Sequence, residues 1–491
     1  MAGGPWSAVT IGQGRPGLFI NFVPTAIAAI SPGVSGVVAS IVKAPWGPDN
    51  QVIEITSEAD LRNFFTQSDT APYNAYYEGH HAFLGGARSI KMYRIEGTGS
   101  VKATHQFSDN GSTNIFTING RYAGAYGNGF SVAVQTNPVV ATATDVLIYQ
   151  GSTLLATYTT SQFARGQQGH INEICSLING DPNNFWVSAV FNNEGNFTPA
   201  SVPSPGVALA GGADGAAPIA ADYTAAMSAL ESEAWNVFHA DVLDGDIAGI
   251  RASIKAWIDG MRNYGKYVAA VIGSDTAETL TVAKTNAVAM NDPAIVYFYP
   301  GVYELNSNGI RVMNRGSAYA ATIAGMYAAL APGDDFTYEG LPNINGLEYK
   351  LNNAQISDGL ANGLCLGTFD GLQYKVEEAI NSLSRLGANQ GDAWKDIQAI
   401  NTMDAIATGI TVSANANYIG KVPNDLVGQN ALIGAVRDFL RVMANSRAIE
   451  PKYTVGLDPR YVSAGKNVFL YVTIQVIESM KFIYFTIQVG P

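Results

Sequence analysis

Residues 247–272 read IAGIRASIKAWIDGMRNYGKYVAAVI, and this stretch decides the class of the fold. Its first part carries apolar side chains at helical spacing, at Ile247, Ile250, Ile254, Trp257, Ile258 and Met261. Its end, from Tyr267 to Ile272, is a continuous apolar run typical of a strand that is buried on both faces. An amphipathic helix that leads into such a strand predicts an α/β fold with a largely parallel sheet, covered on both faces.

The alternation of helices and strands continues on both sides of this stretch. We predict further strands at 36–42, 89–95, 235–239, 294–299 and 363–369. Helices are predicted at 57–65, 73–84, 222–233 and 318–331, and the last is apolar but too short to span a bilayer. The sequence therefore predicts an α/β domain over residues 206–370, with residues 26–100 as a small α/β unit of the same core.

Two segments outside this core have a different pattern. Residues 101–205 contain short strands separated by Gly, Asn and Asp turns, which predicts an inserted antiparallel sandwich or barrel. Residues 198–217 are rich in Pro, Gly and Ala and mark its boundary. Residues 371–463 contain an amphipathic helix at 430–446, and we expect a C-terminal α+β domain there.

Both ends of the chain are predicted to form extended arms. Residues 1–25 lack a helical period but include the apolar strand Leu18–Val23, and residues 464–491 contain two strands that meet at Glu478–Met480. An apolar strand left open invites aggregation, so we expect the last one to be paired on both edges and buried on both faces. The predicted inter-subunit strand residues are Leu18, Phe19, Ile20, Phe22, Phe482, Ile483, Tyr484, Phe485, Ile487 and Val489. Alternatively, the two ends pair with each other or with their own domains.

The amino-acid composition agrees with a subunit that assembles through its surface. Of 491 residues, 47% are hydrophobic and only 14% are charged, as in subunits whose surface is covered by permanent interfaces. A large monomer with a generous core is the alternative. The net charge of −12 argues against nucleic acid as a partner. Two distant cysteines indicate a reducing compartment, and the N-terminal residues do not resemble a signal peptide, so we expect synthesis in the cytoplasm and no membrane partner.

No motif in the sequence predicts catalysis. The G-x-G-x-x-G match at Gly12–Gly17 leads into a strand, whereas a dinucleotide fingerprint leads into a helix. His80 and His81 are adjacent, so they cannot form an i,i+4 metal pair, and surface or capping roles are expected. His239 lacks a G-x-S-x-G partner, and the acidic loop of Asp241, Asp244 and Asp246 reads as a helix cap rather than a cation site. We therefore predict no catalytic, cofactor-binding or metal residues, no cofactor and no enzyme activity; an α/β hydrolase is the remote alternative.

A series of short motifs runs along the sequence. Those nearest the C-terminus are Asn401-Thr402, Met403-Asp404 and Tyr418-Ile419-Gly420-Lys421-Val422-Pro423-Asn424. Further motifs stand at Arg15-Pro16-Gly17, Trp46-Gly47-Pro48, Arg121-Tyr122, Gly127-Asn128, Gly211–Gly215 and Ile323-Ala324-Gly325. Together they cover nearly the whole chain, and in this order they resemble the signatures of contractile phage tail sheath proteins. One departure is the loop Leu330–Gly333, where related chains often carry Ser-Leu-Thr, so contacts at this loop are not carried over.

The resemblance implies a structural subunit whose α/β domain is similar to subtilisin in fold but without its triad. It implies self-association into hexameric rings, stacked helically around a tail tube, with strands donated to neighbours by both arms. The implied partners are other copies of the chain, the tail tube protein, and the baseplate and tail terminator proteins. Contraction would drive the tube into the target cell, and the place of action would be the virion tail. A phage-derived bacteriocin or another contractile injection device is the alternative.

Overall fold

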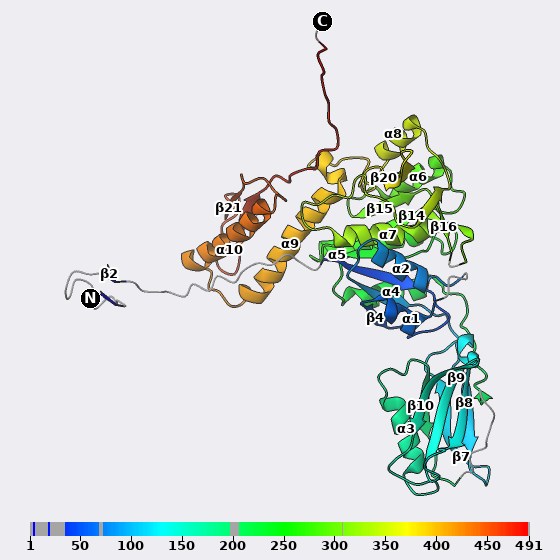
Figure 1. Ribbon diagram of the computed structural model, residues 1–491. Helices are drawn as coiled ribbons and strands as arrows, with labels where there is room; N and C mark the ends of the chain where they lie inside the picture. Colours follow the sequence, from blue (N-terminus) through cyan, green and yellow to red (C-terminus); the bar gives the residue numbers. More distant parts are fainter. Residues whose placement is uncertain are drawn as a thin grey trace. The chain divides into compact units, whose positions relative to one another are not determined.

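The computed structural model describes residues 3–4, 18–19, 35–67, 72–196, 206–306 and 308–489 (Figure 1). By its contacts the chain divides into two compact units. We call the first the central unit; it comprises residues 34–404 and the C-terminal segment from Glu478 onward. The second, the helical unit, contains residues 405–477. Each unit is described by itself.

An eight-stranded sheet forms the middle of the central unit, in the order β20-β19-β15-β14-β13-β3-β5-β4. Its strands are β3 (Val37–Val42), β4 (Val52–Ile55), β5 (Ser89–Arg94), β13 (Val237–His239), β14 (Ala269–Gly273), β15 (Ile295–Tyr299), β19 (Leu364–Phe369) and β20 (Tyr374–Val376). Neighbours from β5 to β19 are parallel, whereas β4 and β20 are antiparallel edge strands. This confirms the predicted, largely parallel sheet, and places the strands of residues 35–94 within it.

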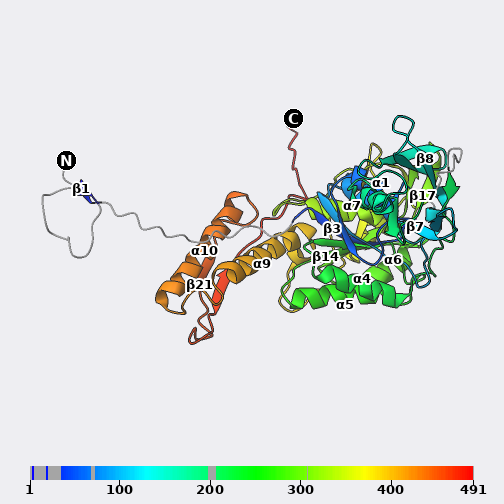
Figure 2. The ribbon, with the colours of Figure 1, turned by 90° about the horizontal axis from the view of Figure 1, so that it is seen from below.

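Helices cover both faces of this sheet (Figure 2). The first face packs against α1 (Glu58–Phe65), α2 (Ala75–Leu84) and α7 (Gly316–Ala329). The second packs against α4 (Ala220–Glu231), α5 (Ile250–Asn263), α6 (Leu280–Met290) and α8 (Asn353–Ala361). Within β3, Val38 and Val42 belong to the first core and Ala39 and Ile41 to the second, because side chains alternate along a strand.

The close packing of α2 against α7 depends on glycine. A Cβ at Gly325 would lie 2.2 Å from the carbonyl oxygen of Ala82, and one at Gly85 would lie 2.1 Å from that of Thr322. No side chain fits such gaps, so the Ile323-Ala324-Gly325 motif serves helix packing.

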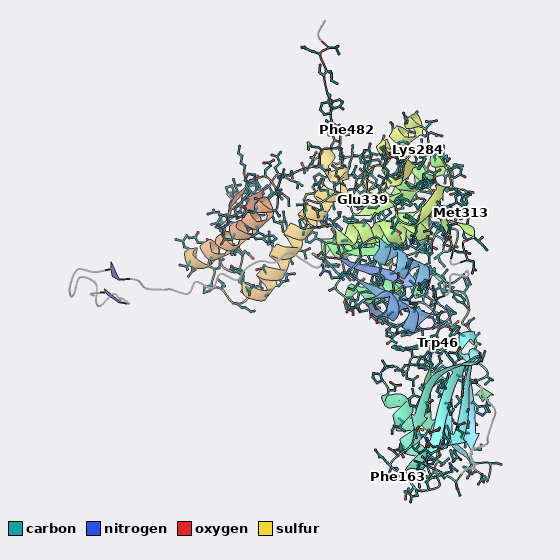
Figure 3. The ribbon with its side chains drawn as sticks, viewed as in Figure 1. Trp46, Phe163, Lys284, Met313, Glu339 and Phe482 are labelled. Atoms are coloured by element: carbon teal, nitrogen blue, oxygen red, sulfur yellow. The ribbon has the colours of Figure 1, made fainter. Side chains whose placement is uncertain are left out.

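Two antiparallel sheets make up the inserted β domain. One has the order β10-β9-β8-β12 and the other β11-β7-β6, and α3 (His170–Gly180) packs beside them. The strands are β6 (Thr104–Ser108), β7 (Asn114–Gly120), β8 (Phe130–Thr136), β9 (Thr144–Gln150), β10 (Thr153–Thr159), β11 (Val187–Phe191) and β12 (Val207–Ala208). Trp46 enters this core from the α/β part, and its indole N–H donates to the carbonyl oxygen of Phe185 at 3.2 Å (Figure 3).

Shorter elements complete the central unit. A small antiparallel sheet has the order β17-β16-β18, with β16 (Val302–Leu305), β17 (Arg311–Asn314) and β18 (Ile344–Leu347). Two short 3-10 helices lie at Ala125–Gly129 and Asp392–Lys395.

The helical unit is built on two helices and a hairpin. Helix α9 (Ile397–Asn417) starts in the central unit and continues into this one, and α10 (Leu426–Asn445) follows it. The hairpin strands β21 (Thr454–Leu457) and β22 (Leu470–Thr473) pair with each other. Val436, Phe439, Leu440 and Met443 of α10 form a core with Val455 of β21. The predicted helix at 430–446 is therefore confirmed, and α9 was not predicted.

The C-terminal end of the chain differs from the predicted strands. The first predicted C-terminal strand is regular only over Leu470–Thr473, and an isolated bridge between Ile449 and Val476 continues the pairing beyond it. Residues 482–489 pair with no strand among the described residues, so the predicted second strand is absent from the isolated chain. At the other end, Leu18–Phe19 pairs in parallel with Gly3–Gly4, whereas Ile20 and Phe22 lie outside the described residues.

Candidate assembly sites

The carboxyl edge of the parallel sheet is the usual place for a catalytic site in this fold class, and here it is closed. Ser40, Glu78 and His239 come together there, but all three are at most 2% exposed. The Ser40 hydroxyl donates to Glu78 at 2.5 Å instead of to the histidine, and the Nδ1 of His239 is bonded to the carbonyl oxygen of Val271. Burial lowers the pKa of His239 and, with the nearby charge of Asp241, raises that of Glu78 well above its ordinary value. No substrate atom could reach this serine.

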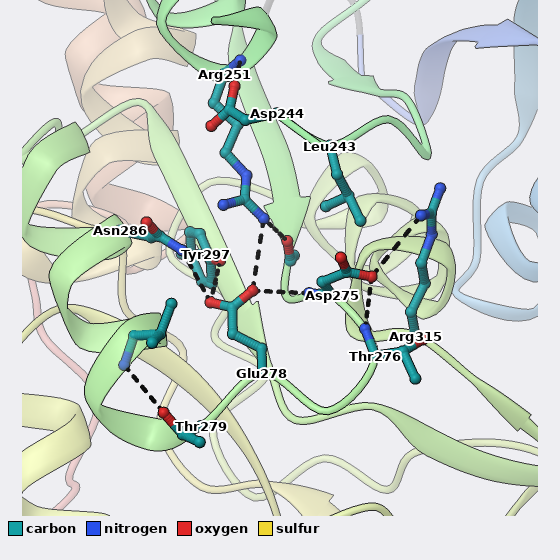
Figure 4. Close-up of polar contacts among 12 residues, drawn as sticks. Leu243, Asp244, Arg251, Asp275, Thr276, Glu278, Thr279, Asn286, Tyr297 and Arg315 are labelled. Carbon is teal, nitrogen blue, oxygen red and sulfur yellow. Dashed lines mark hydrogen bonds and ion pairs between the residues drawn. The ribbon is translucent and has the colours of Figure 1, made fainter. Parts of the chain in front are cut away.

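A second polar cluster at the same edge serves mainly to join elements of the fold (Figure 4). Glu278 accepts hydrogen bonds from the Tyr297 hydroxyl at 2.8 Å, the Asn286 amide at 3.0 Å and the backbone N–H of Asp275 at 2.8 Å. Arg251 donates to the carbonyl oxygen of Gly273 at 2.9 Å and lies 3.8 Å from Glu278. These bonds connect α5, β14 and β15, so the cluster is structural.

The acidic loop after β13 contains the predicted helix cap in one residue, Asp244. Asp246 accepts from the backbone N–H of Leu243, and Asp244 accepts from that of Arg251 at the start of α5. Arg315 donates to Asp241 at 2.8 Å and to Asp246 at 3.1 Å; burial opposes its charge, but these aspartates outweigh burial and raise its pKa. Over the described ranges of the chain, no cluster of His, Cys, Asp or Glu could hold a metal ion.

The expected surface role of the adjacent histidines is wrong for His81. Its ring is 3% exposed, packs against Tyr319 and bonds to the Thr322 hydroxyl at 2.9 Å. Burial, with the neighbouring His80, lowers the pKa of His81 to about 3, so it is a neutral core residue. His80 is partly exposed and pairs with Glu58.

The C-terminal segment exposes a run of large apolar side chains. Phe482, Ile483, Tyr484, Phe485, Ile487 and Val489 are between 63% and 90% exposed. The chain runs away from the central unit at Phe482 (Figure 3). Exposure of so many large apolar side chains in sequence is typical of a binding surface that awaits a partner.

The arm segment has two different faces if it becomes a strand. Side chains alternate along a strand, so Ile483, Phe485, Ile487 and Val489 would share one face, and every one is apolar. The other face would carry Phe482, Tyr484, Thr486 and Gln488. The first face is therefore suited to burial, and the second, with Thr486 and Gln488, is more polar.

Ion pairs hold the segment where it leaves the central unit. The ammonium group of Lys481 donates to Asp396 at 2.6 Å and to Glu378 at 3.1 Å, and the Lys481 side chain is only 10% exposed. Burial opposes the charge on Lys481, but the bond to Asp396 and the charge of Glu378 outweigh it and raise the pKa of the lysine.

Ser479, two positions before Lys481, is also held by hydrogen bonds. The backbone N–H of Ser479 donates to the side-chain oxygen of Gln398 at 2.9 Å, and its hydroxyl donates to Asp335. The segment is therefore fixed at 479–481 and exposed from residue 482 onward.

The motif at 401–404 fastens the first half of α9 to the central unit. The Asn401 amide bonds to the carbonyl oxygens of Leu330 and Ala331, and the Thr402 hydroxyl accepts from the backbone N–H of Gly333 at 3.0 Å. These are backbone atoms of the loop 330–333, so the bonds do not depend on its side chains.

Asp404 makes the strongest of these attachments. Its two carboxylate oxygens accept from the two terminal nitrogens of Arg262, at 2.6 and 2.7 Å. Both side chains are less than one-fifth exposed. A bidentate, largely buried pair of this kind fixes position as well as distance.

The motif at 418–424 shapes the turn between α9 and α10. Gly420 has a φ of +74°, the left-handed region that favours glycine. Lys421 donates to the carbonyl oxygen of Ala416, which caps the end of α9. The Asn424 amide donates to the carbonyl oxygens of Gly465 and Asn467 at 3.0 Å, which ties this turn to the loop before β22. The predicted positions Arg15, Pro16 and Gly17 lie outside the described residues.

The hairpin beside this turn is an open edge. Among the described residues, β21 and β22 pair only with each other and form a two-stranded sheet. Val455, Leu470 and Val472 face the α10 core, whereas Tyr471 is 44% exposed. An isolated two-stranded sheet is marginally stable, and its outer edges can receive an incoming strand. On β21 the carbonyl oxygen of Val455 accepts from Arg437 at 3.3 Å, so an added strand would have to replace that bond.

Sequence reasoning missed the residues that hold these elements in place. Arg262, Gln398 and Lys481 appear in the sequence as ordinary polar residues, and their partners lie far along the chain. Lys481 is separated from Asp396 by 85 positions and from Glu378 by 103. The only available signal was the Met-Asp motif at Asp404, which marks one member of the Arg262 pair.

Comparison with known proteins identifies the family. Three family models match successive parts of the chain: the phage tail sheath protein beta-sandwich domain over residues 97–214, the phage tail sheath protein central domain over 216–382 and the phage tail sheath C-terminal domain over 389–490. Among solved structures, the sheath tail protein of Desulfitobacterium hafniense is similar with a TM-score of 0.68 and 20% identity, covering 94% of this chain and all of that one. The contracted sheath of the anti-feeding prophage is similar with a TM-score of 0.53 and 11% identity, covering 97% and 99% of the two chains.

Curated relatives agree with these matches. Uncharacterized protein YqbK of Bacillus subtilis strain 168 is 22% identical over 499 residues, which cover 97% of each chain. The phage-like element PBSX protein XkdK of the same strain is 24% identical over 403 residues, covering 81% of this chain and 79% of its own. The tail sheath protein of Clostridium phage phiCD119 is 26% identical over 141 residues, covering 28% and 39% of the two chains. The chain therefore belongs to the phage tail sheath family, and is a structural protein of a contractile phage tail or contractile injection system rather than an enzyme.

Proposed function

We propose that this protein polymerises into stacked hexameric rings around a tail tube and contracts to drive the tube through the envelope of a target cell. The observation that carries the proposal is the C-terminal segment, which is fixed to its own subunit at 479–481 and exposed from 482 onward. A segment anchored at one end and apolar along its length is suited to adding a strand to another copy of the chain.

The hairpin of the helical unit is the acceptor in this proposal. It has open edges and one face on the α10 core, and its inward side chains are Val455, Leu470 and Val472. A strand added at either edge would extend that core if its apolar face, with Ile483, Phe485 and Ile487, turned toward the helices. The backbone hydrogen bonds would supply affinity, and the alternating side chains would set the register.

A contact of this kind generates a helical lattice. The donor surface and the acceptor surface are different, so each subunit binds the next in a head-to-tail manner, and repeated rotation and rise give an open helix. Arms that stay paired while the larger units turn would keep neighbours linked as the lattice changes pitch. The extended lattice would then be a kinetically trapped state.

Contraction, in this proposal, gains buried and complementary area between the globular parts of neighbouring subunits. Cryo-electron microscopy of both lattices measures that area directly. Equal buried areas in the extended and contracted lattices would contradict this source of driving force.

Finer assignments belong to the same proposal. The partners would be other copies of the chain, the tail tube, the baseplate and the tail terminator, with assembly in the cytoplasm of the host. The N-terminal segment around Leu18–Phe19 would be a second donated strand, and the α/β domain would be subtilisin-like in fold. A phage-derived bacteriocin or another injection device is the second candidate, since related sheaths occur in the anti-feeding prophage and in an extracellular contractile injection system. Genes for capsid and terminase beside this one would favour a phage.

The direct test is negative-stain microscopy of the purified chain. Striated tubes or rings are expected, and a monodisperse monomer at high concentration would contradict the proposal. Deletion of residues 482–491 is the sharper variant, because it leaves the anchored residues 479–481 in place. This variant should fold with an unchanged thermal midpoint yet form no tubes, and tubes that persist would exclude a role for the C-terminal arm.

A further inference from the structure

The C-terminal arm has a defined point of origin on the central unit. Lys481 inserts its ammonium group between two carboxylates, Asp396 at 2.6 Å and Glu378 at 3.1 Å, while the next residue, Phe482, is 74% exposed. The change from held to exposed therefore occurs within one peptide unit.

The carboxylates that hold Lys481 come from different parts of the central unit. Glu378 follows β20, and Asp396 immediately precedes α9. Asp335, which accepts from the Ser479 hydroxyl, lies in the loop after α7. Three acidic side chains thus converge on a short segment that carries one cation, and the segment lines a hollow together with Leu360, Ile380 and Leu383.

Without these bonds the arm would begin further back in the chain. The preceding backbone attachment is that of Ile477, whose N–H donates to the carbonyl oxygen of Ala448 in the helical unit. Loss of the contacts at 479–481 would therefore free residues 478–481 and detach the origin of the arm from the central unit.

We propose that residues 479–481 are a latch, and that Lys481 is the positioning residue that fixes where and in which direction the C-terminal arm is presented to a neighbouring subunit. This inference rests on the proposed function for its purpose, but the latch itself is a property of the single subunit. A fixed origin keeps the donated strand at a high local concentration near its acceptor. Releasing residues 478–481 lengthens the tether by roughly half, which lowers that concentration by about two-fold on the −3/2 power of length.

Trypsin measures the latch in the unassembled subunit, because it cleaves after lysine and must unfold the local chain to do so. The variants are Glu378→Gln, Asp396→Asn and their combination, all of which keep Lys481 as the cleavage site. The readout is the rate of release of peptide 482–491, followed by mass spectrometry below the concentration for assembly. Charge-assisted bonds are worth about a ten-fold change each in such an equilibrium, so each single variant should release the peptide about ten-fold faster and the double variant up to about a hundred-fold faster.

Two matched variants separate the latch from general effects. Asp392→Asn removes a carboxylate from the same stretch, but Asp392 is 88% exposed and pairs with Lys395, so its release rate should stay within about two-fold of the parent. Lys481→Arg keeps both the charge and the cleavage site, and should retain protection.

The outcomes are distinct. Equal release rates for the parent and the double variant would overturn the latch, as would equal acceleration by Asp392→Asn. A fall in the thermal midpoint of the double variant large enough to account for the faster release would also overturn it. Faster release with an unchanged threshold for tube formation would confirm a latch but refute its positioning role. Failure of the 482–491 deletion to stop assembly would instead contradict the proposed function, and would leave the proteolysis result standing.

Discussion

The alternation of side chains along the C-terminal arm allows a test with single substitutions. Phe485 belongs to the wholly apolar face and Thr486 to the opposite one, and the two are neighbours in sequence. If the arm is donated as a strand, Phe485→Ala removes a buried aromatic side chain from the interface, whereas Thr486→Ala changes the more polar face. An irregular arm would not separate two adjacent positions in this way.

The expected size of the effect follows from the exposure of the Phe485 side chain. Phe485 is 85% exposed in the isolated chain, so its full burial on assembly would gain about 1.5–3 kcal/mol. Each 1.4 kcal/mol is a factor of ten in an equilibrium constant, so Phe485→Ala should raise the critical concentration for assembly by about ten- to one-hundred-fold. Thr486→Ala should change it by less than about three-fold.

The assay is sedimentation of polymer over a range of protein concentrations, with electron microscopy of the pellet. Both variants should share the thermal midpoint of the parent, because neither side chain has a partner to lose in the free subunit among the described residues. Equal critical concentrations for the two variants would refute the strand geometry. No effect of Phe485→Ala would refute burial of that face.

Three further predictions concern the folded subunit, and denaturant unfolding measures each of them. Asp404→Asn should destabilise the central unit by about 3 kcal/mol, because Arg262 would lose its bidentate partner in a largely buried place. A change under about 1 kcal/mol would show that the pair is dispensable. Gly325→Ala should cost about 3 kcal/mol or more, because the added Cβ forces α2 and α7 apart. Gly434→Ala is the control: a Cβ there meets nothing within 4 Å, so this substitution should stabilise α10 by up to about 1 kcal/mol. Similar effects at both glycines would contradict the packing argument. Glu173→Gln should cost about 1–2 kcal/mol at neutral pH, because burial raises the pKa of Glu173 but bonds from three backbone N–H groups outweigh burial and lower it. This stabilisation is present above the unfolded pKa of about 4.5 and is lost as pH falls through the lower folded pKa. A difference in stability between parent and variant that persists at pH 2 would refute this reasoning.

The parts of the fold that sequence predicted are those with a clear hydrophobic pattern. The apolar runs that became β3, β14 and β15, and the amphipathic α5, were predicted because burial on two faces or on one face leaves a readable period. Helix α9 was missed because its residues, IQAINTMDAIATGITVSANAN, are rich in β-branched and short polar side chains, which have modest helix propensity and mark no single face. Its helical state is determined by its neighbours.

The candidate sites were predictable in one part only. The exposed apolar arm from Phe482 to Val489 was visible in the sequence, because consecutive large apolar residues need a partner wherever they lie. Its attachment was not visible, because an ion pair between residues 85 positions apart leaves no local pattern. The preceding strand is shorter than predicted because its regular pairing with β21 stops at Thr473 and only the bridge between Ile449 and Val476 follows, an interruption that the apolar pattern does not reveal.

The loop at 330–333 is held to α9 through its backbone atoms. Asn401 and Thr402 bind carbonyl and N–H groups of this loop, which every residue type supplies except for the N–H of proline. Substitution of the loop side chains therefore leaves these bonds possible, provided that Gly333 keeps its left-handed φ of +93° and its free N–H. The motif residues on α9, in contrast, act through their side chains, so an alanine at Asn401 or Thr402 removes that residue's bonds to the loop. Gln398 would still donate to the carbonyl oxygen of Gly333, so each alanine is expected to weaken the attachment of the loop and not to abolish it.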